Sequence, residues 1–202
     1  EKFPVTIVRP SHTYDRTRLP FHGRYTVIDR MRKGKRVIVH GDGTSLWVLT
    51  HHKDFAKGFV GLLGNQRAIG EAFHITSDEV LSWNQIYTIL AHTAGVEPRL
   101  VHVPSEVIAA FDPDWGASLL GDKAHSVIFD NTKIKRMVPD FAATIPFSRG
   151  AEEILAWFDT GAGADCRQSG GRPGCGRAVD DEVDRLMDTI IAAYESMLPR
   201  KQ

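Results

Sequence analysis

The chain opens on Phe3-Pro4-Val5-Thr6-Ile7-Val8-Arg9-Pro10, a run rich in β-branched residues. A strand that is apolar on both faces is typical of the buried interior of a parallel sheet. Parallel strands need neighbouring strands and covering helices, and no residues before this run supply them. We therefore expect a sheet whose other members are encoded elsewhere. If strand 5–8 is left uncovered, its edge would invite pairing with another chain or with a second copy.

Outward from this run, short apolar stretches alternate with segments of helical periodicity. Strands are expected over 36–40, 46–50, 72–76 and 99–103, and helices over 22–33, 54–63, 82–94 and 105–111. The helix over 54–63 is expected to bury Phe55, Phe59, Leu62 and Leu63 on one face. Such alternation indicates an α/β layer, and the helix-rich later part indicates a smaller lobe beside it.

Helix starts are marked by local signals. Ser82 and Gln85 form a capping box, flanked by the hydrophobic staple Leu81 and Ile86. Ser105 is expected to cap the helix that follows it. The stretch 112–115 looks irregular, Asp130 is expected to cap a helix near 133–138, and a closing amphipathic helix is expected from about 147 to 158.

Composition places the chain among globular proteins. Its 202 residues are 42% apolar, with 25 Lys+Arg against 25 Asp+Glu, so no net charge draws it to nucleic acid. No run of about 18 apolar residues and no signal pattern is present, so we expect no membrane contact and a cytoplasmic location. Cys166 and Cys175 lack a second Cys/His pair at metal spacing, which predicts no zinc site and leaves a disulfide unusual in a reducing compartment.

The character of the sequence changes after residue 159. Residues 160–178 are rich in glycine, lack an apolar period and are interpreted as a linker, while 179–198 are predicted to form an amphipathic helix that needs a surface to pack on. Two origins of the glycine-rich segment stay open, a genuine insertion and a local reading-frame error. Sequencing the coding DNA would separate them.

Three sequence patterns bear on possible chemistry. Gly58, Gly61 and Gly64 have the spacing of a pyrophosphate loop, but they lie inside a helical pattern, so close packing of helix against sheet is the better interpretation. No Tyr-x-x-x-Lys pair exists that could acidify a phenol. His51 and His52 are expected on different sides of a helix, which argues against a metal site. We expect no catalytic residue in this chain.

Five segments, in order, resemble the NAD-dependent epimerase/dehydratase family of extended short-chain dehydrogenases/reductases. These are Val5-Thr6-Ile7-Val8-Arg9-Pro10-Ser11-His12-Thr13-Tyr14-Asp15, the turn Gly41-Asp42-Gly43 with Thr50-His51-His52-Lys53-Asp54, Gly70-Glu71-Ala72-Phe73-His74-Ile75-Thr76, Gly121-Asp122 through Lys133, and Ile145 through Phe158. The resemblance covers residues 3 to 158. It implies an α/β body over 1–159, with partial Rossmann-like parallel strands and a smaller α/β substrate-binding lobe.

The resemblance also implies site residues. The nicotinamide end of NAD or NADP would lie against Pro10 and Ser11, and His12 stands where an Asn commonly contacts substrate. The substrate pocket would include His12, Tyr14, Ile38, His40 and Trp47. The implied reaction is oxidation or reduction of a secondary alcohol or ketone, as part of an epimerase, dehydratase or reductase cycle on a sugar-like small molecule.

Two departures from the family pattern matter. Trp47 and Leu119 stand where nucleotide-sugar enzymes usually carry Arg, so the resemblance implies a substrate less charged than a UDP-sugar. The family's glycine-rich loop and Tyr-x-x-x-Lys are absent, so this chain alone is expected neither to bind the dinucleotide nor to catalyse hydride transfer. The alternative interpretation is a non-catalytic module that binds a ligand, RNA or a partner protein.

Overall fold

The computed structural model describes residues 3–160 and 179–199. Within them the strands are β1 (Ile7–Pro10), β2 (His12–Tyr14), β3 (Val37–His40), β4 (Leu46–Trp47), β5 (Leu49–His51), β6 (Ala72–Ile75), β7 (Leu81–Ser82) and β8 (Leu100–Val103). The α-helices are α1 (Tyr25–Arg32), α2 (His52–Leu62), α3 (Trp83–Thr93), α4 (Ser105–Phe111), α5 (Pro113–Ser118), α6 (Thr132–Met137), α7 (Phe147–Asp159) and α8 (Asp181–Met197). A 3₁₀ turn, Gln66–Ala68, and a π-helical turn, Leu119–Lys123, complete the list.

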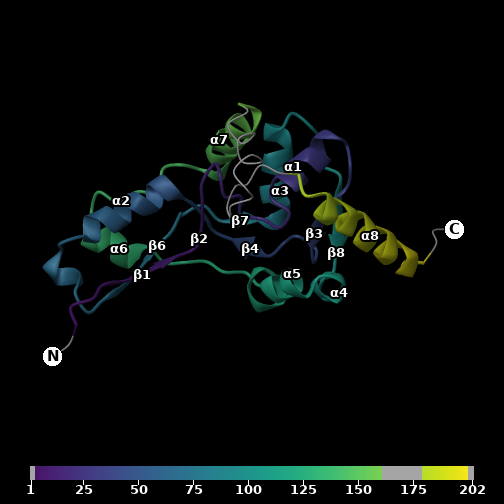
Figure 1. The fold of residues 1–202 in the computed structure, drawn as a ribbon. Coiled ribbons are helices and arrows are strands. Elements are labelled where there is room, and N and C mark those ends of the chain that lie inside the picture. The colour runs from purple at the N-terminus through teal and green to yellow at the C-terminus, as the bar shows by residue number, and fades with distance from the viewer. Residues whose placement is uncertain (1–2, 161–178, 200–202) are drawn as a thin grey trace.

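The strands of the described residues pair two by two. β1 lies parallel to β6, β2 parallel to β5 and β3 parallel to β8, whereas β4 and β7 run antiparallel. Helix α2 and the strands β1 and β6 lie at one end of the molecule, and α8 lies at the other (Figure 1). The fold is therefore mixed α/β with short parallel sheet pairs, as the alternating pattern predicts.

Two separate apolar cores hold these parts together. The larger core joins α1, α3, α7 and α8 to the strand pair β3–β8, and β3 is buried at all four residues. The smaller core lies between α2, β6 and α6 and is centred on Phe73, Ile75 and Phe141. The smaller core belongs to the strand pair that the opening run of the sequence forms.

The capping box at the start of α3 is confirmed. Ser82 Oγ accepts from the Gln85 amide and Gln85 Oε1 accepts from the Ser82 amide, at 3.2 and 2.8 Å. Its staple residues Leu81 and Ile86 are both buried. The position at which α3 begins therefore fixes where the side chains of Trp83 and Tyr87 enter the core.

The glycines of α2 pack closely, as the sequence interpretation proposed. A Cβ on Gly58 would lie 2.7 Å from Ile75 Cγ2 of β6, and one on Gly61 would lie 2.4 Å from Val138 Cγ1, just after α6. Gly64 follows the end of α2 with a φ of 73°, a left-handed conformation that glycine adopts without strain. Gly58 and Gly61 therefore bring backbone near side chains, whereas a Cβ on Gly64 would meet nothing within 4 Å.

Replacing Gly61 by Ala tests this packing. We expect a loss of about 1 to 3 kcal/mol of unfolding free energy, because the added methyl group overlaps Val138. The double variant Gly61→Ala/Val138→Ala should recover part of the loss. Urea unfolding followed by circular dichroism measures both, and a Gly61→Ala variant as stable as the parent would contradict the close contact.

The burial of the opening strand was predicted wrongly. β1 pairs in parallel with β6 as expected, but three of its four residues are exposed, and Val5 and Ile7 are 44% and 48% exposed. The run is apolar on both faces, yet burial depends on neighbouring elements, and in the described residues only β6 pairs with it. Phe59 of α2 and Leu63, the residue just after α2, are likewise exposed, against the expected apolar face.

Other local expectations also need correction. The strand expected over 46–50 is broken at Val48 into β4 and β5, which pair with different partners. Pro104, not Ser105, is the N-cap of α4, and Asn131, not Asp130, is the N-cap of α6. The irregular stretch 112–115 is the start of α5, with Asp112 accepting from the Trp115 amide as its cap.

Of the two segments expected after residue 159, the structure describes only the second. Residues 161–178, including Cys166 and Cys175, lie outside the described residues. In the segment 179–198 the structure has the helix α8, whose residues Met187, Ile190 and Ile191 are buried in the larger core. Arg30, which is fully buried, also anchors α8 through Asp184 and Asp188. No helix in the described part of the chain is long and apolar enough to cross a membrane.

Candidate functional site

Two adjoining cavities lie where parallel strands end. β1 ends at Pro10 and β3 ends at His40, and ligands of open α/β sheets bind outside the carboxyl ends of the strands. We call them the Ser11 cavity, of about 330 Å³, and the aromatic cavity, of about 250 Å³. His12 and Lys123 line both cavities and so mark their junction.

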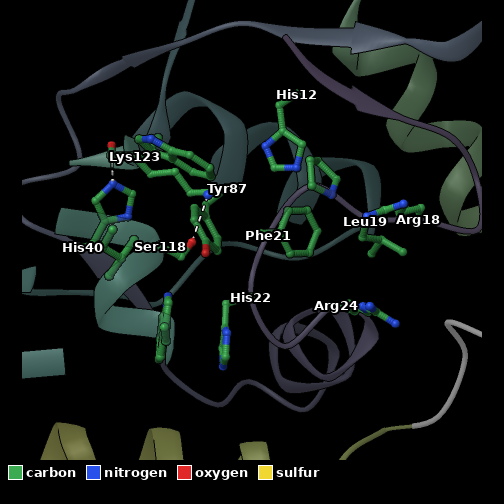
Figure 2. Close-up of a pocket in the computed structure, with 14 residues that line it drawn as sticks. His12, Arg18, Leu19, Phe21, His22, Arg24, His40, Tyr87, Ser118 and Lys123 are labelled. Atoms are coloured by element: carbon green, nitrogen blue, oxygen red, sulfur yellow. Dashed lines mark hydrogen bonds between the residues drawn. The ribbon is translucent and has the colours of Figure 1, made fainter. Parts of the chain in front are cut away.

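The Ser11 cavity is formed by residues of four segments. Its lining residues are Pro10, Ser11, His12, Trp47, Val48, Asp122, Lys123, Val127 and Phe129. The aromatic cavity is lined by His12, Arg18, Leu19, Pro20, Phe21, His22, Arg24, His40, Trp83, Tyr87, Trp115, Ser118, Leu119 and Lys123. Figure 2 shows His12 on one side of the aromatic cavity and His22 on the opposite side, and it places Arg18 and Arg24 across the cavity from Lys123 and His40.

The structure brings five of the seven predicted site residues to these cavities. Pro10, Ser11, His12 and Trp47 line the Ser11 cavity, and His40 lines the aromatic cavity. Tyr14 and Ile38 line neither and are buried at 2% and 1% exposure.

Tyr14 lies in the core beneath α7. A Cβ on Gly150 would lie 2.1 Å from its hydroxyl oxygen, and its ring contacts His51 and Phe147 edge-on. Burial raises the pKa of this phenol, so it stays protonated. Tyr87, which does line the aromatic cavity, has its pKa raised by burial as well. Neither phenol is prepared to act as a base.

Ser11 is held by a network of hydroxyl and amide groups. Ser11 Oγ lies 2.6 Å from Thr50 Oγ1 of β5, and Thr50 Oγ1 accepts from the Ser77 amide at 2.8 Å. The Asn131 amide group donates to the carbonyl of Thr76, and its oxygen accepts from the Thr76 hydroxyl. The network ties together the residues that follow β1 and β6 and so fixes the wall of the Ser11 cavity.

Trp47 sets the protonation of His12. The Trp47 indole Nε1 donates to His12 Nδ1 at 3.2 Å, and an indole N–H can only donate. Burial and, to a smaller extent, the charges of Lys123 and Arg18 together lower the pKa of His12 to about 4, so the ring is neutral near pH 7. Its hydrogen therefore resides on Nε2. His12 is a hydrogen-bond donor at the junction of the cavities.

Replacing Trp47 by Phe should remove the constraint that keeps His12 in the Nε2–H tautomer. We expect His12 in the parent to be the Nε2–H form at pH 7, and the Trp47→Phe variant to populate the Nδ1–H form as well, since its Nδ1 loses the donor. Nitrogen-15 NMR of the histidine rings distinguishes the two forms. Trp157→Phe, in α7, is the control that should leave His12 unchanged. An Nδ1–H form in the parent would refute the assignment.

His40 and Lys123 hold the opposite side of the aromatic cavity. His40 Nε2 donates to the carbonyl of Lys123 at 3.0 Å, and Lys123 Nζ donates to Ser118 Oγ at 2.9 Å (Figure 2). Burial also lowers the pKa of His40. On the floor, His22 and Trp115 stack with ring centroids 4.1 Å apart.

The sequence did not single out most residues of the aromatic cavity. Arg18, His22, Trp115 and Lys123 come from segments far apart in the chain, and no spacing rule links them to one another. Trp83 and Tyr87 share one face of α3, beside the capping box, and Lys123 follows the Gly121-Asp122 motif, but neither signal indicated a cavity. His51 and His52 were expected on different sides of a helix. Instead His51 caps α2, and the two rings lie 4.5 Å apart.

The described residues contain no group of three His, Cys, Asp or Glu side chains that could hold a metal. They also do not fit a whole dinucleotide. The Ser11 cavity suits one small ring, whereas a pyrophosphate needs a glycine-rich turn before a helix, and the glycines of α2 are packed against side chains.

Solved structures with the same fold were found. UDP-glucuronic acid 4-epimerase from Bacillus cereus, in complex with UDP-glucuronic acid and NAD, superposes with a TM-score of 0.57 at 21% identity over 76% of this chain. An epimerase from Methanothermobacter thermautotrophicus gives 0.64 at 18% over 82%, and dTDP-glucose 4,6-dehydratase from Bacillus anthracis gives 0.58 at 18% over 75%. This chain has the fold of the extended short-chain dehydrogenases. It spans 43 to 46% of those three chains.

Two curated proteins are similar to this chain in sequence. 2'-Dehydrokanamycin reductase from Streptomyces kanamyceticus is 29% identical over 132 residues, which is 62% of this chain and 35% of the reductase. The chloroplast stem-loop binding protein of 41 kDa b from Arabidopsis thaliana is 31% identical over 74 residues, 36% of this chain and 20% of that protein. No family model matches. The chain thus spans about a third or less of these relatives.

Proposed function

We propose that this chain is the substrate-binding portion of an NAD(P)-dependent epimerase, dehydratase or reductase acting on a sugar-like secondary alcohol or ketone. The observation that carries the proposal is the junction of the two cavities at His12. The proposed nicotinamide residues Pro10 and Ser11 and the proposed substrate residues His12 and Trp47 line one cavity, which adjoins the aromatic cavity. The similarity to 2'-dehydrokanamycin reductase supports the reaction class.

The roles of this chain's residues follow from their hydrogen bonds. His12 Nε2–H donates to an oxygen of the substrate, and Trp47 keeps that hydrogen in place. Ser11 and Pro10 form the wall against which a nicotinamide would lie, and the cofactor, when bound, supplies the hydride step. The aromatic rings of the adjoining cavity cover the carbon face of the substrate.

A fusion protein tests this function. The full chain is joined behind the part of the Bacillus cereus epimerase that it does not cover, and hydride transfer is followed by NADH absorbance with a panel of sugar alcohols and ketoses. We expect turnover that His12→Ala lowers at least about tenfold, the loss of one hydrogen bond to the reacting group. A folded fusion that retains NAD and transfers no hydride with or without His12 would overturn the proposal.

The chain by itself is predicted not to bind the dinucleotide. Because no glycine-rich pyrophosphate turn exists in its sequence apart from the packed glycines of α2, we expect no heat of NADH binding in titration calorimetry. NADPH should behave in the same way. Micromolar affinity for either dinucleotide would contradict this prediction.

We also propose that the exposed face of β1 is covered by another polypeptide. Val5, Phe59, Leu63 and Ile69 line a third cavity of about 370 Å³, and an uncovered apolar strand edge invites pairing. A second copy would make the protein a homo-oligomer. Light scattering coupled to size exclusion should then show association that Val5→Lys weakens, and a stable monomer would argue against this interface.

The alternative function is a non-catalytic binding module. The similarity to a chloroplast stem-loop binding protein favours this second candidate, with RNA as the ligand. The balanced charge of the chain weighs against it, because RNA affinity rests largely on Lys and Arg contacts with phosphates. RNA retention that weakens steeply with added salt would support the alternative.

A further inference from the structure

The aromatic cavity carries an excess of positive charge. Arg18, Arg24 and Lys123 line it, and no Asp or Glu of the described residues does so. The whole chain, by contrast, has equal numbers of acidic and basic residues. The excess is therefore local to this cavity, where surrounding protein keeps the field strong.

Two of these cations have no protein partner in the described part of the chain. The guanidinium groups of Arg18 and Arg24 make no ion pair and no hydrogen bond there, and both residues are exposed at the mouth of the cavity. Lys123 donates to Ser118, and Asp122, the carboxylate beside it, is 3.6 Å away and 55% exposed. Asp112 approaches His22 to 3.7 Å from outside the lining.

The positive charge acts on the cavity itself. Lys123 and Arg18 both help to keep the pKa of His12 low, after the larger effect of burial. Figure 2 places Arg18 and Arg24 on one side of the cavity and Lys123 on the other. A ligand in the cavity would thus lie between cations.

The walls and the volume limit the size and type of ligand. Trp83, Tyr87 and the stacked pair His22–Trp115 offer flat apolar faces. The volume of about 250 Å³ lies just below the roughly 300 to 1,000 Å³ of pockets that hold drug-sized ligands. The cavity suits a single sugar ring and is too small for a nucleotide joined to a sugar.

We propose that the aromatic cavity binds a small polyol that carries one anionic group, a carboxylate or a phosphate, with Arg18 and Arg24 binding the anion. The proposal rests on the proposed function and names its substrate class. Guanidinium groups bind carboxylate and phosphate oxygens with two parallel hydrogen bonds, and the aromatic rings cover the carbon skeleton. A ligand with one anionic group is much smaller than a UDP-sugar, and a cationic amino sugar would be repelled.

Four probes with a common ring test the charge preference. The full 202-residue chain is titrated with glucuronate, glucose 6-phosphate, glucose and glucosamine, and tryptophan fluorescence and calorimetry report binding. We expect glucuronate or glucose 6-phosphate to bind at least about tenfold more tightly than glucose, and glucosamine to bind most weakly. The stronger of the two anions identifies the carboxylate or the phosphate as the preferred group.

Variants of Arg18 and Arg24 test whether these two residues cause the preference for anions. Arg18→Gln/Arg24→Gln should weaken the preferred anion at least about tenfold and leave glucose unchanged, whereas Arg67→Gln, an exposed arginine outside the lining, should change neither. Circular dichroism confirms that the variants fold. Equal affinity for glucose and the anions, tighter binding of glucosamine, binding of none of the probes, or anion binding that survives in the double variant would each overturn the inference. These results need no cofactor, so the hydride-transfer test of the fusion stands or fails separately.

Discussion

Changing Asp184 and Asp188 of α8 to Asn should lower the unfolding free energy by about 3 kcal/mol or more, since it leaves a buried guanidinium without a carboxylate. The side chain of Arg30 is 0% exposed, and its Nη1 and Nη2 donate to Asp184 Oδ1 and Asp188 Oδ1, each at 2.5 Å. The remaining donors bond to the carbonyls of Asp184 and Arg36. All five N–H groups of the guanidinium are thereby satisfied.

Urea unfolding of the double variant measures this loss. Glu152→Gln, which removes an exposed ion pair with Arg149, is the control and should cost less than about 1 kcal/mol. Adding Arg30→Met to the double variant should restore part of the stability, because an apolar side chain replaces the unpaired charge. A double variant within 1 kcal/mol of the parent would show that α8 docks through its apolar face alone.

Acidification from pH 7 to pH 5 should destabilise the protein by about 2 kcal/mol through His12 alone. Burial lowers the pKa of His12 from 6.5 to about 4, and it lowers the pKa of His22, His40 and His51 as well. The unfolded chain therefore binds more protons than the folded chain in this range. The stability is fully present above pH 6.5 and is lost as the pH falls toward 4.

Unfolding free energies at pH 7, 6 and 5 give the slope. The interval stops at pH 5 because the carboxyl groups of Asp184 and Asp188 have pKa values held below their usual 3.8 and titrate lower still. His12→Asn removes one titrating ring and should flatten the curve. An unfolding free energy that does not change between pH 7 and pH 5 would contradict the lowered pKa values, because it would show that the buried histidine rings accept protons in the folded state.

Signals confined to a few neighbouring residues were predicted well. The capping box of Ser82 and Gln85 formed as expected because both partners belong to one turn. The strand 72–76 and the closing helix were placed within one residue or so for the same reason. The helix α5 was missed because its six residues are too few to display an apolar period, although Asp112 and Pro113 mark its start.

Burial and cavity composition depend on elements far apart in the chain. The exposure of β1 could not be predicted from its own residues, since its sequence has the pattern of a buried strand. Tyr14 followed His12 by two residues, and residues two apart in a strand share a face, so both seemed to belong to the same site. The structure instead places His12 at the cavities and Tyr14 in the core beneath Gly150, where packing of α7 covers it. Trp47 was predicted as a lining residue, but its hydrogen bond to His12 could not be predicted, because the two residues are far apart in the sequence.

The hydrogen bond between the Ser11 and Thr50 hydroxyl groups can form in either direction, and its direction decides which ligand groups the Ser11 cavity can bind. Thr50 Oγ1 already accepts from the Ser77 amide, and either hydroxyl can be the donor between Thr50 and Ser11. When Thr50 donates, Ser11 has a hydrogen to give to a ketone oxygen. When Ser11 donates, its lone pair can receive the hydrogen of an alcohol. Ser11 can thus change from hydrogen-bond donor to acceptor without any movement of the backbone. One residue in the cavity wall can therefore bind both the ketone and the alcohol of a redox couple.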